Sequence, residues 1–251
     1  MIPKIIHYCW FGKAEKPKLF AKCLESWNYY CPDFEIKEWH EGNIKQFKNK
    51  FIKDALRKKK YAFVADAVRM QIVLEFGGVY LDTDMLLLKP LDELLTYNFF
   101  IGNEVINRPA FGIFGVISKH RLIQEMVDFY NTERFDQFSA PVITHKFKHL
   151  IKRENLIVNE RILDVHYFYP LPYENRLDDY APFCSENTIA VHLWDHSWGS
   201  EENESLRSLF KNLQIVIVDY LIYGYSYAYF KRYFRGFSRK VYHHIKRKMG
   251  L

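Results

Sequence analysis

The chain has 251 residues, of which 49% are hydrophobic and 18% aromatic, so it can bury a substantial core and wholesale disorder is excluded. Its net charge of +6 is unevenly distributed: residues 220–251 hold eight of the 36 basic residues and none of the 30 acidic ones. The remainder is slightly acidic, which argues against an extended nucleic-acid footprint, whereas the basic end favours contact with an anionic surface.

The four cysteines form no C-x-x-C pair and no metal-ligand spacing with histidine. We therefore expect reduced thiols and a cytoplasmic location. The N-terminal residues show no signal-peptide pattern, and the sequence holds no apolar run of 18 residues, so we expect no membrane-spanning segment.

The first third of the chain alternates strand and helix patterns. A strand is predicted over 4–10, a helix over 17–31 and an alternating strand over 34–41. The lysine-rich segment 45–60 is typical of a solvated helix or loop, and 61–76 of a nearly all-apolar helix. This alternation predicts an α/β sheet.

Later elements follow less regularly. Further strands are predicted over 99–105, 111–118, 162–170 and 188–194. Further helices are predicted around 121–131, 142–151 and 204–212. We expect two parts, a domain over 1–212 and an aromatic and basic helical tail over 213–251.

Two carboxylates, Asp82 and Asp84, stand at the end of a short apolar strand pattern over 79–81. Gly77 and Gly78 precede that strand and end the apolar helix, as C-terminal glycines do. A bare Asp-x-Asp pair is weak evidence, because chance alone predicts about 0.7 pairs in such a chain. Carboxylates outside the carboxyl end of a strand in an α/β sheet are however placed to hold Mg²⁺ or Mn²⁺ with a phosphate ligand. A polar turn between two strands is the alternative.

Asp66 and Arg69 lie three residues apart, on one face of the apolar helix predicted over 61–76. Buried charge is costly unless it is paired or bound. The two residues therefore form either a structural ion pair or part of a site, where the guanidinium binds a carboxylate or phosphate and the carboxylate accepts from a ligand hydroxyl.

Several linked motifs resemble glycosyltransferase family 32, a family of DXD-containing sugar transferases. The resemblance is carried over residues 2–95 by "IPKIIHYCWFG", "KCLESWNYYCPDFEIKEWHE" and "KKKYAFVADAVRMQIVLEFGGVYLDTDMLLLKPLDELL", and it returns at "AVHLWDHSW", 190–198. It implies a GT-A fold, an α/β nucleotide-sugar-binding fold with a Rossmann-like mixed sheet flanked by helices. It also implies retaining transfer of a hexose from a nucleotide-sugar.

The resemblance further implies a donor, an acceptor and a metal. The donor would be UDP-linked, and the acceptor a saccharide or lipid-linked saccharide in bacterial surface polysaccharide or glycolipid synthesis. Asp82 and Asp84 would bind Mn²⁺ or Mg²⁺ and the diphosphate, with His192 as a further ligand. An imidazole suits Mn²⁺ better than Mg²⁺.

Three residues would take part in catalysis. By the resemblance, Asp66 and Arg69 would contact the donor sugar and its phosphates, and the charge of Arg69 would favour the departing diphosphate. Glu104, directly after the stretch "FFIGN" at 99–103, is the carboxylate we nominate for contact with the acceptor or the sugar.

Three further residues would contact the donor. By the same resemblance, Trp10 would stack on the nucleobase, although a core tryptophan is an equally good interpretation. Ser197 and Trp198 would belong to a loop that closes over the diphosphate. The chain has "HLW" at 192–194 where many family members have "HHW", so a second histidine is absent there.

Two other functions stay open, a metal-dependent phosphohydrolase or nucleotidyltransferase, and a non-catalytic membrane-binding protein. The tail bears on the latter, because residues 220–242 hold ten aromatic residues among the basic ones. We expect a helix that lies in the interface of an anionic membrane and holds the protein at the inner face of the cytoplasmic membrane. The alternative is that these aromatic residues pack on the domain.

Overall fold

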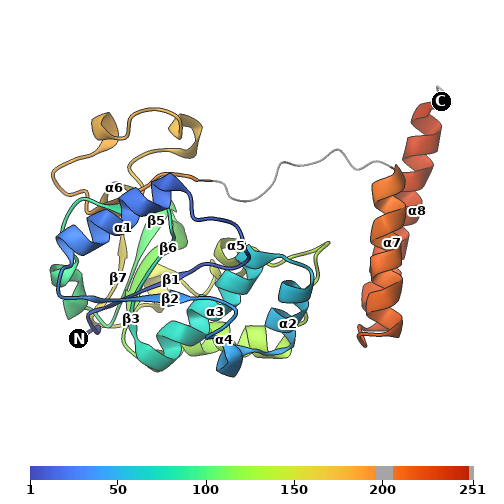
Figure 1. Cartoon of the computed structure of the whole chain (residues 1–251), viewed down its shortest axis with the longest axis horizontal. Helices are drawn as coiled ribbons and strands as arrows, with labels where there is room; N and C mark the ends of the chain where they lie inside the picture. Colours follow the sequence, from blue (N-terminus) through green and yellow to red (C-terminus); the bar gives the residue numbers. More distant parts are fainter. Residues whose placement is uncertain (196–205, 249–251) are drawn as a thin grey trace. The chain divides into compact units, whose positions relative to one another are not determined.

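The computed structural model describes residues 1–195 and 206–248, with the side chains of 207–242 in the second range (Figure 1). The chain divides into two compact units, Met1–Ser197 and Trp198–Leu251. Within the described residues, no helix combines the length and hydrophobicity that a transmembrane span needs.

A six-stranded sheet forms the centre of the first unit (Figure 1). Its strands are β1 (Ile5–Cys9), β2 (Glu35–Trp39), β3 (Gly78–Leu81), β5 (Phe99–Val105), β6 (Arg108–Val116) and β7 (Glu160–Leu163). Their order is β2-β1-β3-β6-β5-β7. β6 runs antiparallel to both neighbours and the other pairs are parallel. The C-terminal ends of β1, β3, β5 and β7 therefore share one edge with the start of β6.

Helices cover both faces of this sheet, which confirms the α/β class with a mixed sheet (Figure 1). They are α1 (Lys18–Tyr30), α2 (Lys50–Arg57), α3 (Tyr61–Phe76), α4 (Arg121–Thr132), α5 (Ile143–Phe147) and α6 (Val165–Phe168). Short 3₁₀ turns span Lys45–Phe47, Asp92–Thr96, Arg153–Asn155, Tyr173–Asn175 and Ala181–Phe183. The buried side chains of α2, α3 and α4 form one core cluster, and those of α1 and α6 form another on the opposite face.

A second, two-stranded sheet adjoins the carboxylate pair. It pairs β4 (Met85–Leu87) antiparallel with β8 (Ala190–His192), so that His192 lies opposite Met85. The pairing brings the late segment of the unit back to the residues that follow β3.

The lysine-rich segment 45–60 contributes more to the core than its composition indicates. α2 buries Phe51 and Ile52 completely, and its lysines lie on the other face. The Asn49 side chain accepts a 2.9 Å hydrogen bond from the Ile52 amide and caps the helix.

The strand predicted over 162–170 is wrong beyond its first residues. β7 ends at Leu163 and α6 follows. Phe168 and Tyr169 are both buried, although they are neighbours. A strand with one face on the core would bury only one of two neighbours, whereas a helical turn can bury both.

The second unit is a helical hairpin. α7 (Leu206–Leu221) is longer than the helix predicted over 204–212, and it runs across the boundary predicted at 212. α8 (Tyr227–Lys248) carries all eight of the basic residues of 220–251 and seven of the ten aromatic residues of 220–242. The buried Asp219 accepts a 2.9 Å hydrogen bond from the Tyr229 hydroxyl, and Phe210 packs against Phe237 at 5.3 Å between ring centres. Part of the aromatic surface thus joins the two helices.

Candidate active site

The turn between α3 and β3 sets the geometry of the site. Gly77 and Gly78 have φ angles of +65° and +102°, and a Cβ atom on Gly78 would lie 2.7 Å from the Ile5 carbonyl oxygen. Glycine is therefore required at this turn. His7 Nε2 donates a 2.9 Å hydrogen bond to the Gly77 carbonyl, and its Nδ1 accepts a 3.1 Å bond from the Trp39 indole. The helix, the glycine turn and the strand occur in the predicted order.

Arg69 on α3 links the helix to the carboxylate at the end of β3. Its Nη2 lies 3.2 Å from an oxygen of Asp66 and 3.2 Å from an oxygen of Asp82. Its Nη1 donates a 2.8 Å hydrogen bond to the Phe111 carbonyl, and its guanidinium carbon lies 4.4 Å from the centre of the Tyr80 ring. The ion pair predicted with Asp66 is present, and the same guanidinium also reaches Asp82.

The three charged side chains of this group differ in their exposure to solvent. The side chains of Asp66 and Arg69 are 7% and 6% exposed, whereas that of Asp82 is 31% exposed. Burial raises the pKa of Asp66 to about 7, against the lowering effect of Arg69. Burial also raises the pKa of Asp82, and Arg69 opposes that rise. Asp82 is therefore the member of this group that a ligand reaches from solvent.

Asp84 is held by the segment that follows β8. His192 Nε2 lies 3.1 Å from Asp84 Oδ1, the Asp195 amide donates a 3.0 Å hydrogen bond to Asp84 Oδ2, and the Leu193 amide donates one of 2.9 Å to the Asp84 carbonyl. Burial acts to raise the pKa of Asp84, but the charge and hydrogen bond of His192 bring it below its usual value. The structure thus places the predicted histidine beside the predicted carboxylate.

The three predicted metal ligands fit a divalent cation. Ligand atoms of Asp82, Asp84 and His192 all lie within 4.8 Å of one another. Two carboxylates and one imidazole suit Mn²⁺, because Mg²⁺ favours oxygen ligands alone. The partial exposure of Asp82 leaves this group of ligands open to solvent on one side.

A bulge in β6 supplies contacts that the sequence analysis missed. Ile101 pairs with Phe114 but Gly102 pairs with Ala110, so 111–113 bulge out of the β5–β6 ladder. Within that bulge Gly112 accepts a 2.7 Å hydrogen bond from the Asp82 amide. Bulges occur next to active sites because they redirect backbone groups. An isolated glycine in the strand pattern 111–118 is the signal that could have indicated this one.

Tyr169 is a second residue that sequence reasoning missed. A Cβ atom added to Gly112 would lie 3.0 Å from the Tyr169 hydroxyl oxygen and 3.3 Å from Asp82 Oδ2, so both oxygens lie close to Gly112. The Tyr169 ring packs edge-on against His192 at 5.6 Å between ring centres. Aromatic residues are common in "HYFYP", so no local pattern distinguishes this tyrosine from its neighbours.

Trp10 lies just after the C-terminal end of β1. Its indole Nε1 donates a 3.1 Å hydrogen bond to the Ala14 carbonyl, and its ring stacks on Phe20 with 6.3 Å between ring centres. The side chain is half-buried. Trp10 therefore lies at the same edge of the sheet as the carboxylates. Its contact with a nucleobase stays a prediction.

Glu104 lies at the end of β5 and forms a 3.0 Å ion pair with Arg108. Its charge contributes to the raised pKa of His192, which burial acts to lower and Asp84 chiefly raises. The contact of Glu104 with the acceptor or the sugar stays a prediction. Ser197 and Trp198 lie outside the described residues, and the loop predicted there stays a prediction.

Residues 17–101 match the family model described as a glycosyltransferase sugar-binding region containing a DXD motif. This match covers about a third of the chain and shows similarity to the DXD-motif glycosyltransferases. The matched region contains α3, the glycine turn, Asp82 and Asp84. It is compatible with the resemblance to family 32.

Curated glycosyltransferases share a quarter or more of the aligned residues with this chain. Human alpha-1,4-N-acetylglucosaminyltransferase is 26% identical over 147 residues, which are 53% of this chain and 42% of that protein. Rat lactosylceramide 4-alpha-galactosyltransferase is 29% identical over 167 residues, which are 60% of this chain and 46% of that protein. An uncharacterized mimivirus glycosyltransferase is 29% identical, with 62% and 58% covered. The chain thus spans about half the length of these relatives.

Solved glycosyltransferase structures are also similar. The PaToxG glycosyltransferase has a TM-score of 0.48 and 18% identity, with 60% of this chain and 69% of that chain covered. The galactosyltransferase LgtC, in complex with donor and acceptor sugar analogs, has a TM-score of 0.42 and 12% identity, with 75% and 86% covered.

Proposed function

We propose that the chain is a retaining, metal-dependent glycosyltransferase that moves a hexose from a UDP-sugar to a saccharide acceptor. The observation that carries this proposal is the convergence of Asp82, Asp84 and His192 within 4.8 Å, inside and beside the matched DXD region. Arg69 adds a positive charge 3.2 Å from Asp82.

The chemistry requires stabilisation of a departing nucleoside diphosphate. The bond between the anomeric carbon and the diphosphate oxygen breaks, the acceptor oxygen bonds to the anomeric carbon, and the hydroxyl proton leaves with the diphosphate. A divalent cation held by Asp82, Asp84 and His192 supplies Lewis-acid stabilisation of that leaving group.

Arg69 acts in this proposal by orienting Asp82. Its guanidinium is 6% exposed and is engaged by Asp66, Asp82 and the Phe111 carbonyl. A bidentate contact with the donor phosphates would require it to leave these partners. Asp66 then compensates the buried charge of Arg69. A contact between Asp66 and the donor sugar is part of the same proposal.

The biological setting is also part of the proposal. We assign the acceptor to a saccharide or lipid-linked saccharide in surface polysaccharide or glycolipid synthesis, and Mn²⁺ as the preferred ion. The rat relative is named for a reaction on lactosylceramide, a glycolipid, which is compatible with this acceptor class.

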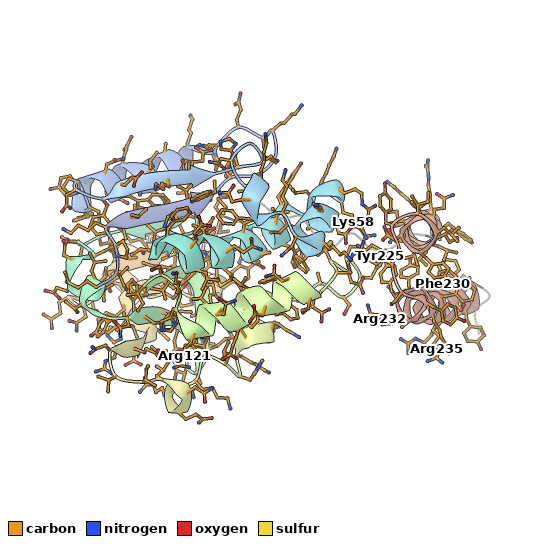
Figure 2. All side chains as sticks on the ribbon, turned by 90° about the horizontal axis from the view of Figure 1, so that it is seen from below. Lys58, Arg121, Tyr225, Phe230, Arg232 and Arg235 are labelled. Carbon is orange, nitrogen blue, oxygen red and sulfur yellow. The ribbon has the colours of Figure 1, made fainter. Side chains whose placement is uncertain are left out.

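The second unit supports a location at a membrane surface. The tip of the hairpin exposes Leu221 and Ile222, each 71% accessible, and α8 exposes Lys231, Arg235 and Arg239 to solvent. Figure 2 shows Arg235 extending away from the hairpin. A hairpin that exposes both apolar residues and cations suits an anionic membrane, where each cation contributes roughly 1 kcal/mol. We propose peripheral attachment to the inner face of the cytoplasmic membrane.

A screen of nucleotide-sugars tests the proposed activity. The whole protein is incubated with Mn²⁺ and each UDP-, GDP- or CMP-sugar, and free sugar and nucleotide are measured. The proposal expects slow hydrolysis of one UDP-hexose to UDP and the free hexose. Release of inorganic phosphate or a nucleoside monophosphate instead would favour a phosphohydrolase or nucleotidyltransferase, and no turnover of any donor would contradict the proposal.

A further inference from the structure

A hollow of about 410 Å³ lies beside the C-terminal ends of β5 and β7. Its polar lining comes from Asn103, Asn107, Arg153, Asp164 and His166. Ile106 and Val165 complete the lining with aliphatic surface. The volume falls within the roughly 300–1,000 Å³ typical of small-molecule sites.

Three separate segments build this hollow. Asn103 precedes the end of β5, Ile106 and Asn107 form the two-residue turn of the β5–β6 hairpin, and Asp164 follows β7 directly. Asn107 has a φ angle of +60°, which the turn requires. The parallel pairing of β5 with β7 places these segments at one edge of the sheet.

The hollow shares that edge with the proposed metal ligands. β5 and β3 are both neighbours of β6, so the two strands lie about two strand spacings apart, on the order of 10 Å. β5 continues beyond the end of β3, because Val105 pairs with Arg108 whereas Leu81 pairs with Ile113. An oligosaccharide bound in the hollow can therefore extend along this edge toward the metal ligands.

The charges of the hollow favour a neutral ligand. Arg153 Nη2 lies 2.9 Å from Asp164 Oδ1, so the one guanidinium of the lining is already paired. A diphosphate or another anion would meet the Asp164 carboxylate beside that cation. Hydroxyl groups, which both donate and accept, match an amide, a carboxylate and a guanidinium together.

Asn103 and Ile106 add two features that fit a sugar. Asn103 is 4% exposed, and among the described residues its Oδ1 has no hydrogen-bond partner. A buried acceptor without a donor costs about 1–3 kcal/mol, and a bound hydroxyl could remove that cost after a small rotation of the amide. Ile106 is 83% exposed and offers apolar surface for the C–H face of a sugar ring.

We propose that this hollow is the acceptor subsite and that it binds a neutral saccharide. The proposal rests on the proposed transferase function for the identity of the bound sugar as an acceptor, but binding itself can be measured without turnover. A free oligosaccharide and the headgroup of a glycolipid share the required chemistry.

The test measures binding of the whole protein to a glycan array in Mn²⁺ and UDP. The array carries neutral oligosaccharides and their sialylated or sulfated counterparts, and the best neutral glycan is then measured both free and as a glycolipid in neutral vesicles. Asn107→Gly removes the amide and keeps the turn, because glycine adopts positive φ freely. Asp164→Asn is the second variant.

Asn159→Gly is the matched control. Asn159 is an exposed asparagine with φ +66° and does not line the hollow. We expect neutral glycans to bind, with at least fivefold weaker binding in Asn107→Gly and Asp164→Asn and wild-type binding in Asn159→Gly, at melting temperatures within about 2 °C of one another. Comparison of the two forms of the glycan assigns the source of the acceptor.

Retention of acidic glycans alone, retention of none, or wild-type binding by both hollow variants would overturn the proposal. The donor screen separates its failure from failure of the proposed function. Donor hydrolysis with glycan binding that ignores the hollow variants contradicts the subsite alone. Glycan binding that depends on the hollow, with no donor turnover, contradicts the transferase alone.

Discussion

Arg69 forms ion pairs with two carboxylates at once, the buried Asp66 and the half-buried Asp82. Asp66 and Asp82 each lie 3.2 Å from the same guanidinium nitrogen, and a backbone carbonyl occupies the other. Lysine presents one compact ammonium and cannot reproduce this planar arrangement. The orientation of Asp82 therefore depends on arginine and not on positive charge alone.

We expect Arg69→Lys to lower kcat/KM for the donor at least tenfold, which is about 1.4 kcal/mol of transition-state stabilisation. Steady-state kinetics with the UDP-sugar found in the screen measure this. Arg161→Lys, at an exposed arginine of β7, is the matched control and should behave as wild type. Normal turnover with a lower melting temperature in Arg69→Lys would reduce the pair to a structural salt bridge.

His7 makes the stability of the fold depend on pH. Burial lowers the pKa of His7 to about 4, because the ring is held neutral between Trp39 and the Gly77 carbonyl. In the unfolded chain the pKa is near 6.5. Above about pH 6.5 both states are neutral, and between 6.5 and 4 only the unfolded state gains a proton, so stability falls as the pH falls through this window.

The expected loss from His7 is roughly 3 kcal/mol between pH 7 and pH 4. Asp66 has the opposite effect on stability. Its pKa is about 7 in the folded state, against 3.8 as the ordinary value, so its contribution to the free energy of unfolding decreases as the pH rises from 3.8 to 7. Urea unfolding of wild type and His7→Gln at several pH values isolates the histidine, since Asp66 is present in both. An equal pH dependence in the two proteins would contradict the assignment.

At the scale of elements, local patterns predicted more than pairing did. The strand predicted over 99–105 matches β5, and the order of helix, glycine turn and strand around 61–84 is observed. Those elements are encoded by residues close in sequence. The bulge at 111–113 and the turn to α6 after Leu163 depend on partners far along the chain, so periodicity alone could not give them.

The residues of the candidate site also fall into a group that is close in sequence and a group that only distant pairing brings together. Asp66, Arg69, Asp82 and Asp84 lie within 19 positions of one another, and their types and spacing left both a site and a structural role open until the family resemblance favoured a site. His192 reaches Asp84 only through the pairing of β4 with β8, and it was predicted through the family resemblance. Gly112 contributes a backbone carbonyl, which no residue-type pattern reports.

The pairing of β4 with β8 leads to a prediction about metal binding. His192→Ala should weaken Mn²⁺ binding at least tenfold, because it removes one of three ligands. At saturating Mn²⁺ this lowers the metal-dependent stabilisation by about 1.4 kcal/mol. Thermal unfolding with Mn²⁺ and with EDTA measures the difference. His145→Ala, an exposed histidine, serves as control, and equal Mn²⁺-dependent shifts in the two variants would exclude His192 as a ligand.

At the scale of the whole molecule, the two units separate chemistry from proposed attachment. The carboxylates, the histidine and the hollow belong to the first unit, and the exposed apolar and basic residues belong to the helical hairpin. Acceptors that are lipid-linked would be concentrated for an enzyme held at the same surface.

Co-sedimentation with vesicles tests this attachment in the full chain. We expect binding to anionic vesicles at low salt, less binding at high salt, and little binding to neutral vesicles. The double substitution Leu221→Glu and Ile222→Glu should reduce binding at least fivefold. Ile157→Glu with Val158→Glu, at two exposed aliphatic residues of the first unit, is the control. Binding that neither salt nor the hairpin substitutions affect would rule out this surface.

The central claim is that a metal held by the carboxylate pair supports sugar transfer. The most direct measurement is the rate of UDP release from the UDP-hexose in Mn²⁺, in excess EDTA, and in Asp84→Asn with Mn²⁺, with the fold checked by circular dichroism. We predict at least a hundredfold loss both in EDTA and in folded Asp84→Asn, about 2.7 kcal/mol in each case. Wild-type release rates in EDTA, or in folded Asp84→Asn, would contradict the account.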